Sequence, residues 1–188
     1  MTSKWNFIII ALTLLGCRQT YQKSFDDILN QHLINIVEPI DNKTGKLFPP
    51  PGLDSNYSNV ESDVTVYIKD EFVQDSMYIN QLMHIIMEPE YQQIISTNKI
   101  SHLRLDLSRV RLAGEKYGYT FQRLSESQVE KFPNSNVLIF FQPLISEHYA
   151  IIGYILSSGP KSGFKKVILL SENEEVWHIV DSIEIERW

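Results

Sequence analysis

The sequence predicts a mixed α+β domain in which an antiparallel β-meander packs against two or three helices. Two patterns lead to this prediction. In the last third of the chain, apolar segments of strand length alternate with short turn sequences. In the first half, apolar residues recur every three or four positions, which is the spacing of an amphipathic helix. Strands and helices that fall in separate parts of a chain are typical of the α+β class.

The meander is predicted from four apolar segments near the carboxyl end. They cover residues 137–141, 148–156, 165–171 and 176–180, and residues 183–188 extend the last of them. Turn-forming residues separate these segments, namely Gln142-Pro143, the Gly- and Ser-rich residues 158–163, and the acidic residues 172–175. Neighbouring strands that are joined by short turns pair antiparallel.

Three helices are expected in the first half of the chain. The first covers residues 24–39, with Ser24 as its N-cap. The second begins at Asp75 or Ser76 and ends near residue 87, and a short third helix covers residues 91–96. The methionines of the second helix are interpreted as core filler rather than as a binding strip; these are Met77, Met83 and Met87.

Three further strands are predicted in the middle of the chain. Residues 64–68 and 119–123 alternate between apolar and polar side chains. Leu103, Leu105 and Leu107 alternate in the same way, so we expect a strand there that continues to Leu112. The alternating aromatics Tyr117, Tyr119 and Phe121 are interpreted as core residues rather than as a ligand-binding face. Residues 41–63 are predicted to form an irregular, Pro-rich segment. A mobile or structural role is favoured over a functional one for it.

The amino end has the organisation of a secretory signal. Lys4 precedes an apolar run from Phe7 to Leu15, and the run is too short to span a membrane. It ends in Leu14-Leu15-Gly16-Cys17, which resembles a bacterial lipobox. The resemblance implies cleavage between Gly16 and Cys17 and a diacylglyceryl group on the Cys17 thiol. A plain signal peptide with an incidental cysteine is the alternative.

The lipobox divides the chain into a signal peptide (residues 1–16), a lipidated tether (residues 17–23) and a single α+β domain (residues 24–188). Acyl chains on Cys17 would hold the domain on a membrane, because each buried CH₂ contributes about 0.8 kcal/mol. In bacterial lipoproteins an Asp after the cysteine favours the inner membrane. Arg18 stands there instead, so the resemblance favours the outer membrane, with the domain facing either the periplasm or the cell surface.

Composition excludes several classes of function. Removing residues 1–16, whose only charged side chain is Lys4, leaves 16 basic and 23 acidic residues, a net charge of −7. Binding to phosphates needs a basic face, so nucleic acid is not an expected partner. Cys17 is the only cysteine, so its lipidation leaves no thiol for a disulfide, for catalysis or for a zinc site. We expect no cofactor.

The last 50 residues or so resemble the ends of many small uncharacterised lipoproteins of Bacteroidota. The resemblance lies in a strand, a glycine-containing turn, a second strand, an acidic turn and a Trp-x-Ile-Val segment. The matching positions are residues 151–156, Gly159, Gly163, residues 168–170, Asn173 and residues 177–180. Many of those proteins carry cysteines in the glycine turn, and this chain has none. The resemblance implies a compact α+β domain and no known reaction. A cystatin-like cone is the structural alternative.

No residue pattern points clearly to catalysis. The five histidines lack metal-ligand spacing, and His32 and His84 are interpreted as hydrogen-bonded structural residues. Residues 159–163 match neither a nucleophile elbow nor a phosphate loop and are predicted to form a turn. Glu147 and His148 are weak candidates for an acid–base pair, because adjacent residues on a strand point to opposite faces. We predict no metal site.

These observations predict a lipid-anchored envelope protein that acts as a non-enzymatic binding or interaction module. One specific form is an immunity protein that blocks a rival's toxin, since a small acidic domain suits a basic partner. The alternative is a small periplasmic or surface hydrolase that uses Glu147 or His148 in a cleft.

We expect cells that express the full chain to incorporate labelled palmitate into it, and a Cys17→Ser variant to carry none and to leave the membrane fraction. The reason is that Cys17 supplies the only thiol for acylation. Metabolic labelling followed by membrane fractionation checks this, and protease treatment of intact cells then reports which way the domain faces. A wild-type chain without label contradicts the anchor.

Overall fold

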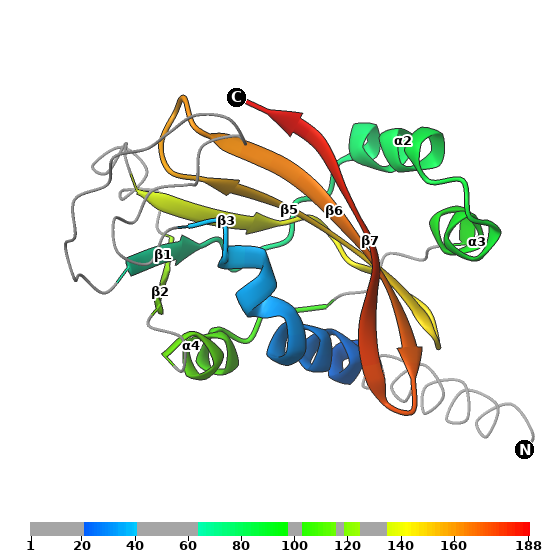
Figure 1. Cartoon of the computed structure of the whole chain (residues 1–188), viewed down its shortest axis with the longest axis horizontal. Coiled ribbons are helices and arrows are strands. Elements are labelled where there is room, and N and C mark those ends of the chain that lie inside the picture. Colours follow the sequence, from blue (N-terminus) through cyan, green and yellow to red (C-terminus); the bar gives the residue numbers. More distant parts are fainter. Residues whose placement is uncertain (1–20, 41–63, 98–102, 116–118, 125–134) are drawn as a thin grey trace, which may run out of the picture.

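A computed structural model describes residues 21–40, 64–97, 103–115, 119–124 and 135–188 of the chain (Figure 1). The predicted signal peptide, Cys17 and the Pro-rich segment all lie outside these residues. A helix occupies residues 21–37. The remaining elements are β1 (Val64–Ile68), α2 (Ser76–Ile85), α3 (Pro89–Thr97), α4 (Leu107–Glu115), β2 (Tyr119–Arg123), β3 (Asn136–Phe140), β4 (Leu144–Ile145), β5 (Tyr149–Ser157), β6 (Gly163–Asn173) and β7 (Val176–Arg187).

The described strands form one seven-stranded sheet with the order β2-β1-β3-β5-β6-β7, and β4 pairs with β5. The predicted antiparallel meander is confirmed, because β3, β5, β6 and β7 pair antiparallel in turn. The other end of the sheet differs from the prediction, since β1 pairs parallel with both β2 and β3. The fold is therefore α+β, as predicted, with a small parallel part added to the meander.

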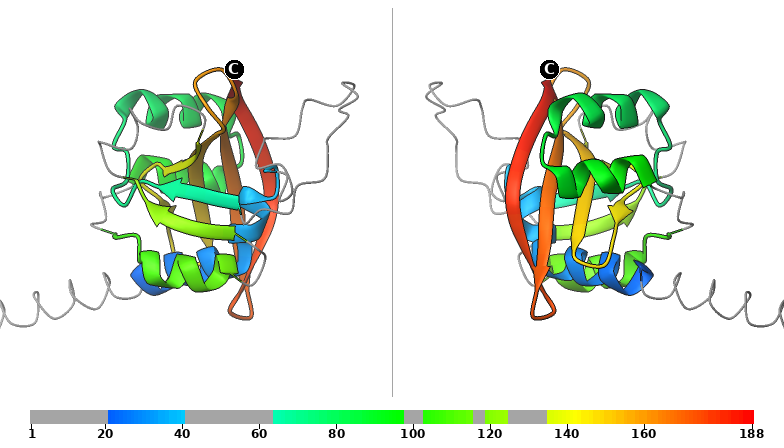
Figure 2. Two further views of the ribbon diagram at one scale, coloured as in Figure 1. Left: turned by 90° about the vertical axis from the view of Figure 1, so that its left-hand side faces the viewer. Right: turned by 90° about the vertical axis from the view of Figure 1, so that its right-hand side faces the viewer.

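Helices cover both faces of the sheet. Figure 1 shows α2 and α3 above it and the 21–37 helix and α4 below it, and Figure 2 shows the same two layers from the sides. The larger core joins the 21–37 helix to β1, β2, β3 and one face of β5 and β6. A second core joins α2 and α3 to the other face of β5 and β6. The alternation along β5 follows from this, with Ile152 and Tyr154 in the first core and Ile151 in the second.

Residues 103–112 do not form the predicted strand. Residues 103–106 are irregular, and α4 begins at Leu107. Leu103 and Leu105 are buried, as their alternation suggested, but they pack on the core from an irregular segment that pairs with none of the described strands. The alternation ends where Asp106 accepts a hydrogen bond from the Ser108 N–H (3.0 Å), which is the geometry of a helix N-cap. Leu112 consequently lies on the solvent side of α4 and is 71% exposed.

The first helix also differs at its start. Residues 21–23, expected in the tether, are helical, so Ser24 lies inside the helix and does not cap it. The second helix agrees with its prediction, because Asp75 is the N-cap of α2 and accepts a hydrogen bond from the Met77 N–H (2.8 Å). The third predicted helix corresponds to α3.

The interpretation of the methionines as core filler is wrong. The row of α2 that faces the core consists of Tyr78 and Leu82, and Ile86 continues it at the C-cap. Met77, Met83 and Met87 lie off this row and are 71%, 40% and 77% exposed. The aromatic interpretation is confirmed for the described residues, since Tyr119 and Phe121 are buried; Tyr117 lies outside them.

Side chains protect the two outer edges of the sheet. On β2, Arg111 Nε donates a hydrogen bond to the Phe121 carbonyl (3.0 Å). On β7, the Trp177 N–H donates to Gln31 Oε1 (2.9 Å), and His32 Nε2 donates to the Trp177 carbonyl (2.7 Å). Two register shifts against β6 further distort β7. Such features hinder edge-to-edge pairing with another sheet.

We expect Tyr78→Phe to raise the free energy of unfolding by about 1 kcal/mol, because it removes a buried hydroxyl that has no hydrogen-bond partner among the described residues. The ring would still stack on Phe141, whose centroid is 4.2 Å away. Denaturant unfolding measures the change.

Gly153→Ala is the matched steric test, since an added Cβ would overlap the Tyr78 hydroxyl. Gly153→Ala should lower the free energy of unfolding by about 1–3 kcal/mol. The loss should be smaller when Tyr78 has already been replaced by Phe. A Tyr78→Phe variant that is clearly less stable would show that the hydroxyl has a partner.

Candidate functional site

A polar cleft lies where β1, β2 and β3 end. Because β1 is parallel to both neighbours, the carboxyl ends of the three strands share one edge of the sheet. Ligands of open α/β sheets bind in crevices at such edges. The cleft has a volume of about 770 Å³. The described residues that line it are Asp70, Glu71, Phe72, Gln74, Leu103, Arg104, Leu105 and Gln142.

Main-chain hydrogen bonds fix one wall of the cleft, the segment that follows β1. The Val73 N–H donates to the Phe140 carbonyl (2.9 Å), and the Gln142 N–H donates to the Val73 carbonyl (3.0 Å). These bonds extend the pairing of β1 and β3 beyond both strands. Phe72 packs edge-on against Phe25 of the 21–37 helix, with ring centroids 5.2 Å apart.

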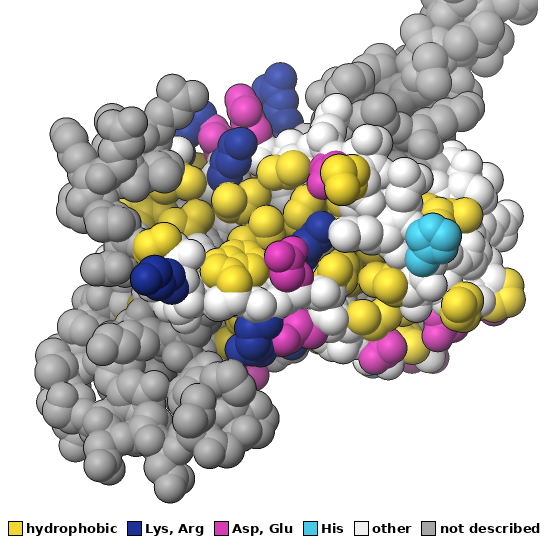
Figure 3. Space-filling model, turned by 90° about the horizontal axis from the view of Figure 1, so that it is seen from above, with side chains coloured by type: hydrophobic (Ala, Val, Ile, Leu, Met, Phe, Trp, Pro, Cys, Tyr) yellow, Lys and Arg dark blue, Asp and Glu magenta, His cyan; other side chains and the backbone are white. Residues whose placement is uncertain are grey.

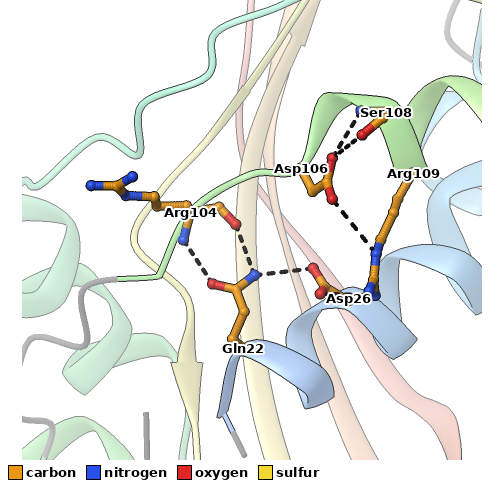
Figure 4. Close-up of polar contacts among 6 residues, drawn as sticks. All are labelled: Gln22, Asp26, Arg104, Asp106, Ser108 and Arg109. Carbon is orange, nitrogen blue, oxygen red and sulfur yellow. Dashed lines mark hydrogen bonds and ion pairs between the residues drawn. The ribbon is translucent and has the colours of Figure 1, made fainter. Parts of the chain in front are cut away.

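Gln22 fixes the opposite wall (Figure 4). Its amide nitrogen donates to the Arg104 carbonyl (2.9 Å), and its amide oxygen accepts from the Arg104 N–H (2.9 Å). The side chain thus satisfies both main-chain groups of Arg104, as a neighbouring strand would. The Arg104 side chain points away from this network (Figure 4). It makes no hydrogen bond or ion pair with its guanidinium to any residue that the structure describes.

Asp26 lies behind Gln22 and is nearly buried. It accepts hydrogen bonds from Gln22 Nε2 (3.0 Å) and from Arg109 Nη1 (2.9 Å). Burial raises the pKa of Asp26 above its usual range, although the Gln22 hydrogen bond and the Arg109 charge oppose the rise. Asp106, on the other side of Arg109 (3.6 Å between Arg109 Nε and Asp106 Oδ2), behaves in the opposite way. Hydrogen bonds from Ser108 hold the pKa of Asp106 below its usual range.

The charges of the cleft are mostly paired. Arg123, which ends β2, forms an ion pair with Asp70. Arg109 is shared between the two aspartates of the network in Figure 4. The guanidinium of Arg104 and the carboxylate of Glu71 have no charged partner among the residues that the structure describes. Among the described residues that line the cleft, Arg104 and Glu71 are therefore the charged groups without a charged partner, while the network around Arg109 holds two carboxylates for one guanidinium.

The structure separates the acid–base candidates from this cleft. Glu147 and His148 lie in the bend between β4 and β5, and both are exposed. They are not adjacent strand residues as the sequence suggested, because β5 begins at Tyr149. His148 Nδ1 instead lies 4.0 Å from Glu172 Oε2 on β6. Neither Glu147 nor His148 lines the cleft.

The structure also locates the histidines and the turn that the sequence analysis considered. His32 is hydrogen-bonded as predicted, and its Nδ1 is 3.3 Å from the Asn35 amide nitrogen. The prediction for His84 is wrong, because this residue is exposed on the outer side of α2. Residues 159–163 form the turn between β5 and β6, as predicted. Cys17 lies outside the described residues. Within the described ranges, no group of three His, Cys, Asp or Glu side chains could hold a metal ion.

A second surface feature is apolar. Met77, Met83 and Ile85 are exposed around α2, Met87 is exposed just after the helix, and Trp188 is exposed just after β7. We call these five residues the apolar face. α2 and the end of β7 lie at the top of Figure 1, and Figure 3 looks down on that side. Hydrophobic side chains occur at several places on this side, with acidic, basic and other polar groups between them (Figure 3).

Comparisons with known proteins add no assignment to either surface. No protein family matches this chain, and no curated protein or solved structure matches it. Among the described residues no helix is long and apolar enough to cross a membrane.

Sequence reasoning missed the network of Gln22, Asp26, Arg104 and Arg109. Gln22 and Arg104 are 82 residues apart, and neither belongs to a recognisable motif. The local signal that was present, the N-cap pattern at Asp106, was hidden by the alternating leucines before it.

We expect wild-type protein to lose stability relative to an Asp26→Asn variant as the pH rises from about 3 to 7. A carboxyl group whose pKa is raised by folding contributes stability that is fully present below its unfolded pKa, near 3.8, and is lost as the pH rises through its folded pKa. Urea unfolding of both proteins across this range measures the difference. Glu147→Gln, an exposed change, is the control. A difference that grows in favour of the wild type with rising pH would show that the Arg109 pair outweighs burial.

Proposed function

We propose that this chain is a lipid-anchored envelope protein that acts as a non-catalytic binding module for a protein partner. The observation that carries the proposal is the apolar face. Monomeric proteins rarely expose large apolar side chains together unless the surface binds something. Methionine is also a residue that adaptable binding surfaces use, because its flexible thioether fits varied partners.

The position of the apolar face relative to the proposed anchor supports this function. The 21–37 helix starts at the bottom of Figure 1, whereas α2 and the carboxyl end lie at the top, and both side views in Figure 2 agree. An acylated Cys17 lies four residues before this helix in the sequence. A membrane on the side of residue 21 would leave the apolar face directed away from the lipid, where a partner protein can reach it.

Charge indicates the kind of partner. The chain has a formal net charge of −6. Acidic residues flank α2 in the sequence, with Asp75 at its start and Glu88 and Glu90 after its end, and Glu186 is exposed near the end of β7. A partner with an apolar patch and a basic rim would complement this surface. A basic toxin that the module neutralises is the specific form that we favour.

A small hydrolase is the second candidate function. The contact between His148 and Glu172 is the one observation in its favour. The His148 side chain is 65% exposed, and the pair lies outside the cleft. Catalytic acid–base groups usually lie in a pocket that binds the substrate and excludes water. We therefore place this function second.

A photo-crosslinking amino acid at position 87 of the full-length, membrane-bound chain should yield one discrete protein adduct. The same residue at position 112, which is equally apolar and exposed but lies on α4, should yield none. The identified partner should then bind the purified chain, and Met77→Asp with Met87→Asp should weaken binding at least about tenfold, or about 1.4 kcal/mol. Leu112→Asp should leave the affinity unchanged.

The two methionines are exposed, so the double change should not affect folding, which a circular dichroism spectrum verifies. If the partner is a toxin, co-expression of the wild-type chain should protect cells and the double variant should not. Equal adducts at positions 87 and 112, or equal affinities of the two kinds of variant, would contradict the proposal.

A further inference from the structure

We infer that the cleft at the carboxyl ends of β1, β2 and β3 binds a small zwitterion, namely an amino acid or a short peptide. In this arrangement the guanidinium of Arg104 binds the carboxylate of the ligand, and the carboxylate of Glu71 binds its ammonium group. This inference concerns a surface different from the apolar face and stands independently of the proposed protein partner.

The size and place of the cleft suit such a ligand. Its volume of about 770 Å³ lies within the range of about 300–1,000 Å³ that small-molecule sites occupy. The cleft lies between a segment that follows β1 and a segment that precedes α4, at an edge where parallel strands end together. Two walls from separate parts of the chain can each contribute one charged group.

The pairing of charges determines the chemical class of the ligand. Of the charged side chains that line the cleft, Asp70 is paired with Arg123, whereas Arg109 pairs with Asp26 and Asp106, none of which lines it. These pairs leave Arg104 on one wall and Glu71 on the other as the charged groups of the cleft without a charged partner among the described residues. A simple anion would meet Glu71 unfavourably, and a simple cation would meet Arg104 unfavourably. A ligand that carries both charges can satisfy both walls.

Arginine is well suited to the first of these contacts. The planar guanidinium donates two parallel hydrogen bonds to one carboxylate, which gives both affinity and orientation. The main chain of Arg104 is held by Gln22 through two bonds of 2.9 Å, so the base of the side chain is fixed before a ligand arrives. Fixing the site in advance lowers the entropic cost of binding.

The remainder of the cleft can accept an apolar side chain. Leu103 and Leu105 are buried in the larger core, and Phe72 packs against the same core. These residues provide an apolar floor next to the two charged groups. The amide of Gln74 is exposed at the rim and can bond a peptide group. We therefore expect a ligand with an aliphatic or aromatic side chain to bind more tightly than glycine.

Isothermal titration calorimetry on the purified full-length chain in detergent tests this inference. The probes are the dipeptide Leu-Phe, its N-acetyl derivative and its carboxyl amide. We expect saturable binding of the free dipeptide, and about tenfold weaker binding of each blocked form, because each has lost one of the two charge contacts.

Two variants assign the contacts. Arg104→Gln should remove the preference for the free carboxylate over the amide but keep the preference for the free amine. Glu71→Gln should do the reverse. Lys161→Gln and Glu90→Gln, which change exposed charges outside the cleft, are the matched controls and should bind as the wild type does. Both cleft side chains extend from the surface, so their replacement should leave the unfolding midpoint unchanged.

The outcomes are distinct. No saturable binding at millimolar dipeptide overturns the inference. If both variants still prefer the free dipeptide over both blocked forms, the inference is also overturned, because the carboxylate and the ammonium group would then be bound by other residues. Sensitivity to the carboxylate alone would show a simple anion site and refute the zwitterion assignment. None of these results depends on whether Met77 and Met87 contact a protein partner, so failure here is distinguishable from failure of the proposed function.

Discussion

Burial of the β5–β6 hairpin on both faces is the constraint on which the rest of this structure depends. Ile152 and Ile168 face one core, and Ile151 and Leu169 face the other. Removing one such side chain from water is worth roughly 1.5–3 kcal/mol, so neither face can remain open. The 21–37 helix and α4 cover the first face, and α2 and α3 cover the second. The positions of both candidate surfaces follow from this double cover.

The apolar face results from how α2 is placed. The helix buries the row that contains Tyr78 and Leu82, and this choice turns Met77 and Met83 to the solvent. The cleft results from how the 21–37 helix is placed. By packing across the sheet it brings Gln22 to the segment before α4, where the amide holds Arg104. Asp26, one turn further on, accepts the hydrogen bond of Arg109 and secures the start of α4 behind the cleft.

The success of the sequence predictions depended on how local their signals were. The strands of the meander and the start of α2 were predicted correctly, because alternation and helix-starting signals act within a few residues. The strand over residues 103–112 was predicted wrongly, because Leu103 and Leu105 alternate for burial although the structure describes no strand paired with them. The prediction that the methionines of α2 are core residues was wrong for another reason. Several rows of that helix are apolar, and the sequence alone does not indicate which one meets the sheet.

By itself the sequence determined the α+β class, the approximate positions of most helices and strands, the excess of acidic charge and the lipobox pattern at Cys17. Only the tertiary structure decided that β1 lies parallel between β2 and β3, and that Arg104 and Glu71 share one cleft. The physical reason is the distance along the sequence between the residues that interact. A helix start or an alternating strand is encoded by neighbours along the chain, whereas the contact of Gln22 with Arg104 joins residues 82 positions apart and depends on the tertiary fold.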